Sequence, residues 1–482
     1  MGTERIPSGV PGLDELLGGG LIPRRSYLVR GGPGTGKTML SQQFLAEGVR
    51  QGEASLAISL EEAEEQYRAD ATAAGVDLSG VEILDLSALP ESFAEDQAYD
   101  LFSPAEVERG PTTTRIVEVI ERLRPARVVI DSMTRFRMYA TNPYAFRRQV
   151  DAFVRYLTSA GATVLFISEA IQPSYDYDLC FLADGTFTLE VDAELRTIQV
   201  DKFRGGQHRT GRHAFKIGDG GIRVFPRLVP GNHGAEFARQ LVPSGIPELD
   251  RLLSGGIERG LVTMISGPSG AGKTTLGMQF LMGAVAAGER VALFAFEEPV
   301  ATMTARCTAL GMPIQGAIDS GALLVRSIEP LQVSSDELAA EIVEVVSQAG
   351  RTAVMLDSVA AYRLALRGDD LVERLHSLCR YLGNMGCTVI LVNEVTSVGS
   401  GLRFTEAGLS YLADNLIYLT YFEDRSSTGS RVARAVTVAK KRVSAYDDAL
   451  YELVFGDDGI MLRGPLVARG FVEGAVVVDR DE

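Results

Sequence analysis

The chain alternates short apolar runs with longer amphipathic stretches, a pattern typical of parallel strands connected by helices. In the first half, the apolar runs that predict buried strands are 27–30, 54–60, 127–131 and 163–168. The stretches that predict helices are 39–50, 111–124 and 143–160, and β-rich stretches follow at 185–190 and 196–203. We therefore expect an α/β fold with a mostly parallel, doubly wound sheet and a β-rich C-terminal extension.

The second half of the chain repeats this pattern. Its expected strands and helix are 261–265, 291–296, 352–357, 369–385 (the helix), 388–393, 415–421 and 434–441. Three motifs recur in register, because Ser8–Asp14, Lys37 and the pair Glu61-Glu62 each have a counterpart 236 positions later. Such a repeat indicates an internal duplication. We expect two domains, 1–232 and 233–482, joined by a Pro- and Gly-containing linker.

Each half carries a glycine-rich loop between an apolar strand and a helix. The loops read GGPGTGKT (31–38) and GPSGAGKT (267–274). Glycines let backbone N–H groups converge on a phosphate, the lysine reaches the outer phosphates, and the threonine can hold magnesium. The residues expected to bind ATP here are Gly32, Pro33, Gly34, Thr35, Gly36, Lys37, Thr38 and Met39, and Ser269, Gly270, Ala271, Gly272, Lys273, Thr274 and Thr275.

Carboxylates follow two of the predicted strands in each half, where ligands bind in open α/β sheets. Asp131 and Asp357 end strands beside the phosphate loops and are suited, with Thr38 and Thr274, to a hydrated magnesium ion. Glu61-Glu62 and Glu297-Glu298 are predicted to position or deprotonate the attacking water; these four glutamates are the main catalytic candidates. A simpler interpretation of each pair is a solvated helix start.

Composition narrows the class of protein. The formal net charge is −16, which argues against a general nucleic-acid or anionic-membrane coat. The 46% hydrophobic content suffices for two cores, and the four cysteines form no CxxC motif. No apolar run of about twenty residues is present, so we expect no membrane span. A cytoplasmic location, where ATP and Mg²⁺ are abundant, is expected.

Together these motifs resemble the KaiC family, the RecA-like ATPase/autokinases of the circadian clock and their prokaryotic relatives. The resemblance rests on motifs that occur in both halves and on one that occurs in the first. The paired motifs are PSGVPGLDELL (7–17) and PSGIPELDRLL (243–253), the two phosphate loops, SLEE (59–62) and FEEP (296–299), and VVIDS (128–132) and VMLDS (354–358). The single motif is KFRGGQH (202–208). It implies two tandem RecA-like P-loop NTPase domains, with ATP and Mg²⁺ bound between the subunits of a homo-hexameric double ring. A KaiB-like or other signalling partner is implied too, whereas a KaiA-type tail interaction is not expected.

The resemblance also implies roles for residues near the end of each half. Lys202, Arg204 and His208 would reach the nucleotide of the neighbouring subunit, with Arg204, and Arg442 in the second half, stabilising transition-state charge. As an isolated motif, KxR after a strand is usually a solvated edge. The further residues expected to contact ATP are Arg196, Phe203, Arg434, Lys440, Lys441 and Arg442.

The family's phosphoacceptor Ser-Thr pair matches Ser410-Tyr411, so one hydroxyl is retained. Ser410 is therefore the candidate site of autophosphorylation, with Glu297 or Glu298 accepting the hydroxyl proton. The alternative is a buried helix-capping serine.

Two other functions stay open at this point. A RecA- or DnaB-like motor on single-stranded DNA would use the arginines and aromatics that follow Asp131, although an interface or surface helix is the simpler interpretation. These residues are Arg135, Phe136, Arg137, Tyr139, Arg147 and Arg148. A signalling scaffold, in which ATP holds the ring together and turnover is incidental, is the third possibility.

Overall fold

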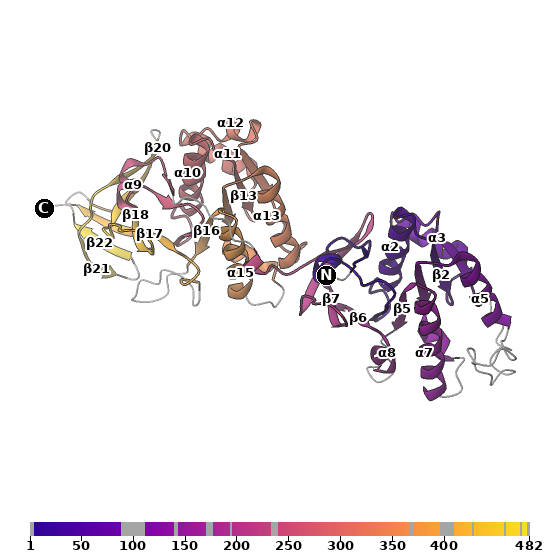
Figure 1. Ribbon diagram of the computed structural model, residues 1–482. Helices are drawn as coiled ribbons and strands as arrows, with labels where there is room; N and C mark the ends of the chain where they lie inside the picture. The colour runs from indigo at the N-terminus through magenta and orange to yellow at the C-terminus, as the bar shows by residue number, and fades with distance from the viewer. Residues whose placement is uncertain are drawn as a thin grey trace. The chain divides into compact units, whose positions relative to one another are not determined.

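The computed structural model describes residues 4–87, 111–138, 143–169, 177–192, 195–232, 240–366, 371–395, 409–426, 429–456, 459–472 and 475–479. The chain divides into two compact units, Met1–Arg227 and Leu228–Glu482, which are called the first and second lobe below (Figure 1). The division lies five residues before the border expected from the sequence. Leu228 packs against a core of the second lobe, and the Pro230 carbonyl accepts a 2.6 Å hydrogen bond from Asn384 Nδ2.

The first lobe alternates strands and helices before a run of antiparallel strands, as its sequence pattern predicts. Its elements are α1 (Leu13–Leu16), β1 (Ser26–Gly31), α2 (Lys37–Arg50), β2 (Ser55–Ser59), α3 (Glu64–Ala73), β3 (Glu82–Asp85), α5 (Pro111–Leu123), β4 (Arg127–Asp131), α6 (Met133–Met138), α7 (Pro143–Ser159), β5 (Thr163–Glu169), α8 (Tyr177–Leu182), β6 (Gly185–Asp192), β7 (Leu195–Phe203), β8 (Arg212–Gly218) and β9 (Gly221–Phe225). The 3₁₀ helix η1 (Pro230–Asn232) follows at the start of the second lobe.

The second lobe repeats most of this order, has two helices in place of α3, and adds a C-terminal hairpin. Its elements are β10 (Leu241–Val242), α9 (Pro247–Leu252), β11 (Ile257–Glu258), β12 (Val262–Gly267), α10 (Lys273–Ala286), β13 (Val291–Ala295), α11 (Val300–Ala309), α12 (Ile314–Asp319), β14 (Leu323–Ser327), α13 (Ser335–Ala349), β15 (Ala353–Asp357), α14 (Val359–Leu364), α15 (Leu371–Asn384), β16 (Thr388–Glu394), β17 (Asn415–Ser426), β18 (Gly429–Lys441), β19 (Tyr451–Gly456), β20 (Gly459–Arg463), β21 (Ala468–Val472) and β22 (Ala475–Asp479).

Both sheets have the same strand order. The first is β3-β2-β4-β5-β1-β6-β7-β8-β9 and the second is β14-β13-β15-β16-β12-β17-β18-β19-β20. Pairing is parallel from β3 to β6 and antiparallel from β6 to β9. The second sheet has the same pairing along this path and gains the β21–β22 hairpin, whose β22 pairs parallel with β17. The expected fold, two tandem α/β lobes with a mostly parallel sheet and a β-rich extension, is confirmed. In each lobe the phosphate loop follows a central strand, β1 or β12, with parallel neighbours on both sides.

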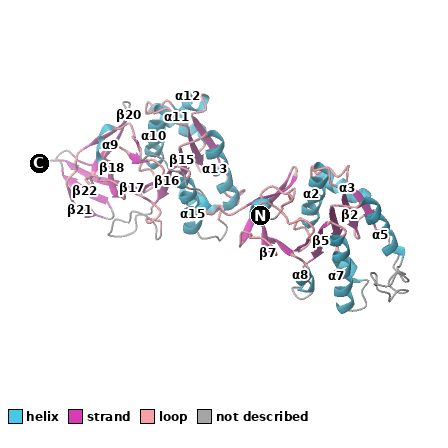
Figure 2. Ribbon diagram, in the orientation of Figure 1, coloured by secondary structure: helices cyan, strands magenta, loops and turns pink. Residues whose placement is uncertain are grey.

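Helices pack on both faces of each sheet (Figure 2). Because successive side chains of a strand point to opposite faces, β15 contributes Met355 to the core beneath α10 and Val354 and Leu356 to the core beneath α13 and α15. In β4, Val129 faces the α2 side while Val128 and Ile130 face the α5 and α7 side. Burial on both faces explains why the central strands are continuous apolar runs.

One buried ion pair distinguishes the second lobe from the first. The Lys441 side chain is fully buried at the end of β18, where its ammonium lies 3.2 Å from Glu258 and donates to the Leu253 and Gly256 carbonyls. Burial alone would raise the pKa of Glu258, but the Ser444 hydroxyl and Lys441 hold that pKa below its usual value. At the matching end of β7, the first lobe has Phe203 in its hydrophobic core.

Replacing only one member of this pair is expected to destabilise the second lobe strongly. Lys441→Met leaves Glu258 buried without its counter-ion, and such a loss typically costs about 3–5 kcal/mol of unfolding free energy. Glu258→Ile/Lys441→Phe copies Ile22 and Phe203, the matching core residues of the first lobe, and should regain most of that stability. Chemical denaturation of the full chain, with the first lobe as internal reference, measures both. A single variant as stable as the wild type would contradict the prediction.

Candidate nucleotide-binding sites

The first phosphate loop wraps the start of α2. Gly34 and Gly36 have positive φ values of 69° and 99°, which favour glycine, and Lys37 is the first residue of the helix. Lys37 Nζ donates to the Gly32 carbonyl at 2.8 Å, so the lysine already folds over the loop. The loop lines a cavity of about 350 Å³. The described residues around it are Pro33, Gly34, Gly36, Lys37, Thr38, Met39, Gln42, Glu61, Glu62, Asp70, Asp131, Ser132, Ile167 and Glu169.

The second phosphate loop is built in the same way. Gly270 and Gly272 have φ values of 73° and 101°, and Lys273 Nζ donates to the Pro268 carbonyl at 2.8 Å. Burial lowers the pKa of Lys273, while nearby carboxylates oppose the shift. The cavity here is about 490 Å³. It is lined by Ser269, Gly270, Gly272, Lys273, Thr274, Thr275, Glu297, Arg306, Ala309, Leu310, Asp357, Ser358, Val392, Glu394, Arg434 and Phe455.

A threonine and an aspartate meet at the floor of each cavity. Thr38 Oγ1 donates to Asp131 Oδ2 at 2.9 Å, and Thr274 makes the equivalent bond to Asp357. Burial raises the pKa of Asp131 to about 7 and that of Asp357 to about 6; the adjacent glutamates add to each shift, and the threonines oppose it. An uncompensated buried carboxylate beside a hydroxyl suits a divalent cation, because magnesium is usually held by one or two protein groups together with phosphate and water.

These raised pKa values predict that both lobes lose magnesium in acid. Below its pKa, each aspartate is protonated and carries no charge with which to orient the water shell of magnesium, so protons compete with the ion. The apparent Mg²⁺ affinity of each lobe should fall about tenfold per pH unit below the raised pKa of its aspartate, about 7 for Asp131 and about 6 for Asp357.

Magnesium titrations of ATP hydrolysis, with one lobe inactivated at a time, measure this loss. Asp131→Asn should lower the Mg²⁺ affinity of the first lobe at neutral pH and make it less dependent on pH, leaving only the titration of ATP itself. A first lobe whose Mg²⁺ affinity falls as steeply in acid with Asp131→Asn as in the wild type would contradict the assignment.

The two glutamate pairs lie in the turns after β2 and β13. Ser132 Oγ donates to Glu61 Oε1, and Ser358 Oγ donates to Glu297 Oε1 at 3.1 Å. Glu62 Oε2 is buried and has no hydrogen-bond partner in the described part of the chain. Burial raises the pKa of Glu62, and the charges of Asp70 and Glu61 raise it further. The helix of the simpler interpretation does exist, but α3 begins only at Glu64, after the pair.

The structure brings most of the sequence-predicted residues together around each loop. Arg196 Nη1 donates to the Gly34 carbonyl at 2.7 Å, and Arg434 Nε donates to the Gly270 carbonyl at 3.1 Å. Both arginines therefore reach the phosphate loop of their own lobe. Glu298 is not among the residues that line the second cavity, because its carboxylate pairs with Arg306 at 2.8 Å.

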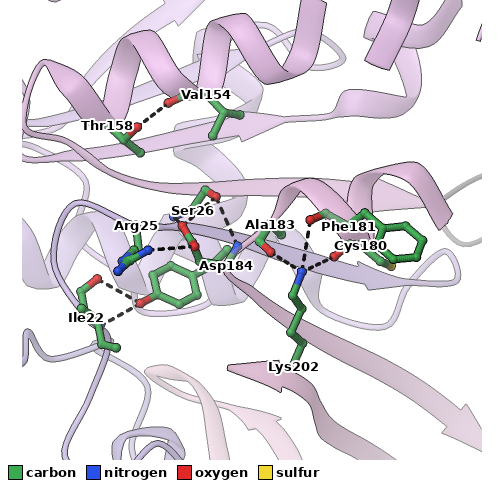
Figure 3. A network of polar contacts seen from close by, with 11 residues as sticks. Ile22, Arg25, Ser26, Val154, Thr158, Cys180, Phe181, Ala183, Asp184 and Lys202 are labelled. Carbon is green, nitrogen blue, oxygen red and sulfur yellow. Dashed lines mark hydrogen bonds and ion pairs between the residues drawn. The ribbon is translucent and has the colours of Figure 1, made fainter. Parts of the chain in front are cut away.

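The lysines expected to act across a subunit interface have partners within their own lobe. Lys202 Nζ donates to the carbonyls of Cys180, Phe181 and Ala183 at 2.6–3.2 Å, at the C-terminal end of α8 (Figure 3). Lys440 Nζ donates in the same way to the Ser410 and Ala413 carbonyls. These contacts show each lysine securing the turn before the next strand, so their predicted contact with ATP stays a prediction.

The other residues predicted near a neighbouring nucleotide divide by burial. Phe203 is buried and stacks on Tyr27. The Lys441 ammonium is buried in the second lobe, where Glu258 and two backbone carbonyls bind it. These environments favour structural roles for both residues over contact with ATP. Arg204 and Arg442 are exposed, and Arg442 pairs with Asp414 at 2.9 Å. His208 lies beside the Phe203 ring. Trans contacts of Arg204, His208 and Arg442 stay predictions.

The remaining candidates have contrasting surroundings. Ser410 is exposed, which disagrees with the alternative of a buried capping serine. Arg135 donates to the Leu60 carbonyl and Arg147 pairs with Asp178, so two of the arginines considered for single-stranded DNA have partners in their own lobe. Tyr139 and the Phe136 side chain lie outside the described residues. None of the described helices combines the length and apolarity needed to cross a bilayer.

Sequence reasoning missed three positions in each site. Ser132 and Ser358 orient the first glutamate of each pair. Glu169 and Glu394 line the cavities from the ends of β5 and β16. The helix that follows each glutamate pair contributes one further lining residue, Asp70 in α3 and Arg306 in α11. The signal that could have found Glu169 and Glu394 is the rule already applied to the aspartates, a carboxylate at the end of a predicted parallel strand.

Two lobes of this topology, each with a phosphate-loop lysine, a threonine–aspartate pair and a serine-held glutamate in one cavity, define a tandem P-loop ATPase of the RecA-like class. A family model described as "ATPase: KaiC" matches residues 6–229 and again 242–465. The chain belongs to the KaiC ATPase family.

Curated relatives extend over nearly the whole chain. "Circadian clock oscillator protein KaiC" of Prochlorococcus marinus (strain MIT 9313) is 27% identical, covering 96% of this chain and 93% of the relative. The protein of the same name from Synechococcus elongatus is 28% identical over 93% of this chain and 87% of its own length. "Circadian clock protein KaiC3" of Synechocystis sp. is 25% identical, with 96% and 92% covered. The resemblance seen in the motifs is thereby confirmed.

Proposed function

We propose that this chain hydrolyses ATP in both lobes, with magnesium as the cofactor. The observation that carries the proposal is the duplicated arrangement in which a buried lysine, a threonine–aspartate pair and a serine-held glutamate line one cavity in each lobe. A phosphoryl-transfer site needs these groups, because it must neutralise phosphate charge, hold a divalent ion and orient a nucleophile.

The residues divide the work as follows. Lys37 and Lys273 offset negative charge on the β- and γ-phosphates, while Thr38 with Asp131, and Thr274 with Asp357, hold the ion and its waters. Magnesium, when bound, supplies positive charge to the bridging and terminal phosphate oxygens. Glu61 and Glu297, each held by a serine hydroxyl, orient the attacking water and take its proton. The oxygen of that water bonds to the γ-phosphorus as the bond to the β–γ bridging oxygen breaks, which releases ADP and phosphate.

The finer features implied by family membership are part of the proposal. The chain forms a homo-hexameric double ring, in which Arg204 and Arg442 approach a neighbour's nucleotide and a KaiB-like protein or another signalling partner reads the nucleotide state. Ser410 accepts the γ-phosphoryl group of ATP bound by the second lobe of a neighbouring subunit; ADP leaves, and Glu297 or Glu298 takes the hydroxyl proton. The exposure of Ser410 and of both arginines supports these assignments, since each must meet another subunit.

The test is a measurement of ATP binding and phosphate release by the purified full-length chain in Mg²⁺, together with native mass and intact mass. Two ATP per chain, magnesium-dependent phosphate release, a six-subunit assembly and a mass increase lost in Ser410→Ala are expected. Absence of bound ATP from both lobes would overturn the whole proposal. Phosphate release that depends on single-stranded DNA would favour a motor instead.

A further inference from the structure

The two sites share most of their charged groups. Each has its phosphate-loop lysine, an arginine that donates to a loop carbonyl, and three carboxylates at strand ends. The matched carboxylates are Glu61 and Glu297, Asp131 and Asp357, and Glu169 and Glu394. Charge differences between the sites must therefore come from elsewhere.

They come from one position of the helix that follows the glutamate pair. In the first lobe this position is Asp70 of α3, and 236 residues later, in α11 of the second lobe, it is Arg306. Both residues line their cavities. The duplicated chain thus places opposite charges at the same point beside two otherwise similar sites.

In the first lobe, Asp70 increases the negative charge around Glu62, for which the described part of the chain shows no ion pair. Glu62 lines the same cavity as Asp70, and its Oε2 atom is buried without a hydrogen-bond partner in the described part of the chain. The Gln66 side-chain amide donates a 2.6 Å hydrogen bond to Asp70 Oδ1, but it brings no charge that would offset the carboxylate. Asp70 and Glu62 therefore add two negative charges to the shared set.

In the second lobe, the same region is neutral. Arg306 Nη2 lies 2.8 Å from Glu298 Oε2, and this pairing cancels the charge that Glu62 keeps in the first lobe. Arg306 lines the cavity, whereas Glu298 does not. Because Glu62 and Glu298 are counterparts, the difference of two unit charges between the lobes comes from the exchange of Asp70 for Arg306.

We propose that the Asp70/Arg306 position sets how strongly each lobe depends on a divalent cation to bind ATP. The first lobe holds an excess of carboxylates where the phosphates must lie, so it binds the nucleotide well only with a cation that offsets them. In the second lobe, the positive charge of Arg306 offsets part of the carboxylate charge, so this lobe retains ATP when Mg²⁺ is removed. This inference rests on the proposed function, since it assumes that both cavities bind ATP.

The physical basis is Coulomb interaction at close range. Free ATP is an anion of high charge, so a cation beside the cavity attracts it and a carboxylate in the same place repels it. Because Arg306 and Asp70 are both solvent-accessible, we expect screening to reduce the effect of a charge reversal to about tenfold in affinity.

The experiment exchanges the two charges in the full-length chain. ATP binding is measured by calorimetry in Mg²⁺ and in EDTA, with Lys273→Met present to isolate the first lobe or Lys37→Met to isolate the second. In EDTA, Asp70→Arg should raise the affinity of the first lobe about tenfold, and Arg306→Asp should lower that of the second about tenfold. Both changes should be smaller in Mg²⁺.

Two further variants separate this role from a structural one. Glu65→Arg places the same new charge on α3 at an exposed residue outside the lining of the cavity, and it should leave the Mg²⁺ dependence unchanged. Arg306→Lys retains the cation and should behave like the wild type. If both lobes bind ATP in Mg²⁺ but the charge exchange leaves the EDTA affinities unaltered, this inference is wrong while the proposed function stands. Failure of wild-type binding in Mg²⁺ would sink both.

Discussion

Lys37→Met is expected to reduce ATP hydrolysis by the first lobe about 100- to 1,000-fold, and Lys273→Met should do the same in the second. Each lysine is the first residue of the helix behind its phosphate loop and is more than 90% buried, so it is held where the outer phosphates would lie. Methionine retains most of the length of the side chain but has no charge. The loss should therefore appear in both ATP affinity and turnover.

The measurement is phosphate release by each single variant and by the double variant. Each single variant should retain the activity of the untouched lobe, and the double variant should retain almost none. Thermal unfolding controls for the loss of the bond from each lysine to its loop carbonyl, Gly32 or Pro268. A double variant that still releases phosphate at the wild-type rate would show that these cavities are not the catalytic sites.

Glu61→Gln/Glu62→Gln should lower phosphate release by the first lobe about 100- to 10,000-fold while ATP stays bound. A glutamine can accept the Ser132 hydrogen bond that Glu61 accepts, but it cannot take a proton from water. The substitution also removes negative charge from the cavity, so ATP affinity should rise rather than fall. A split between affinity and turnover is the signature expected of a catalytic carboxylate.

The assay uses the Lys273→Met background, so that only the first lobe contributes. The single variants then assign the roles within the pair: Glu61→Gln should account for most of the loss, because Glu61 is the carboxylate that Ser132 orients. Phosphate release that is unchanged in the double-glutamine variant would remove both residues from the mechanism. Glu297→Gln in the Lys37→Met background provides the matching measurement in the second lobe.

Local sequence sufficed for the features that depend on contiguous residues. The phosphate loops could be predicted because glycines, lysine and threonine act within one strand–loop–helix segment, and Asp131 could be predicted because it ends an apolar run. Phe203 and Lys441 show the limit of the same approach. Lys440 and Lys441 are neighbours in sequence, yet successive residues of a strand point to opposite faces, so only Lys441 is buried in the core of the lobe.

The sequence by itself determined the duplication, the fold class, both phosphate loops, the strand-end aspartates and the membership of the KaiC family, since each of these is written in short contiguous patterns or their repetition. Only the tertiary structure decided which distant side chains meet at each cavity. It placed Ser132 against Glu61, Lys202 against the end of α8, and Asp70 or Arg306 beside the glutamate pair. Those contacts depend on helix phase and strand register, which set the direction of a side chain and which spacing along the chain does not encode.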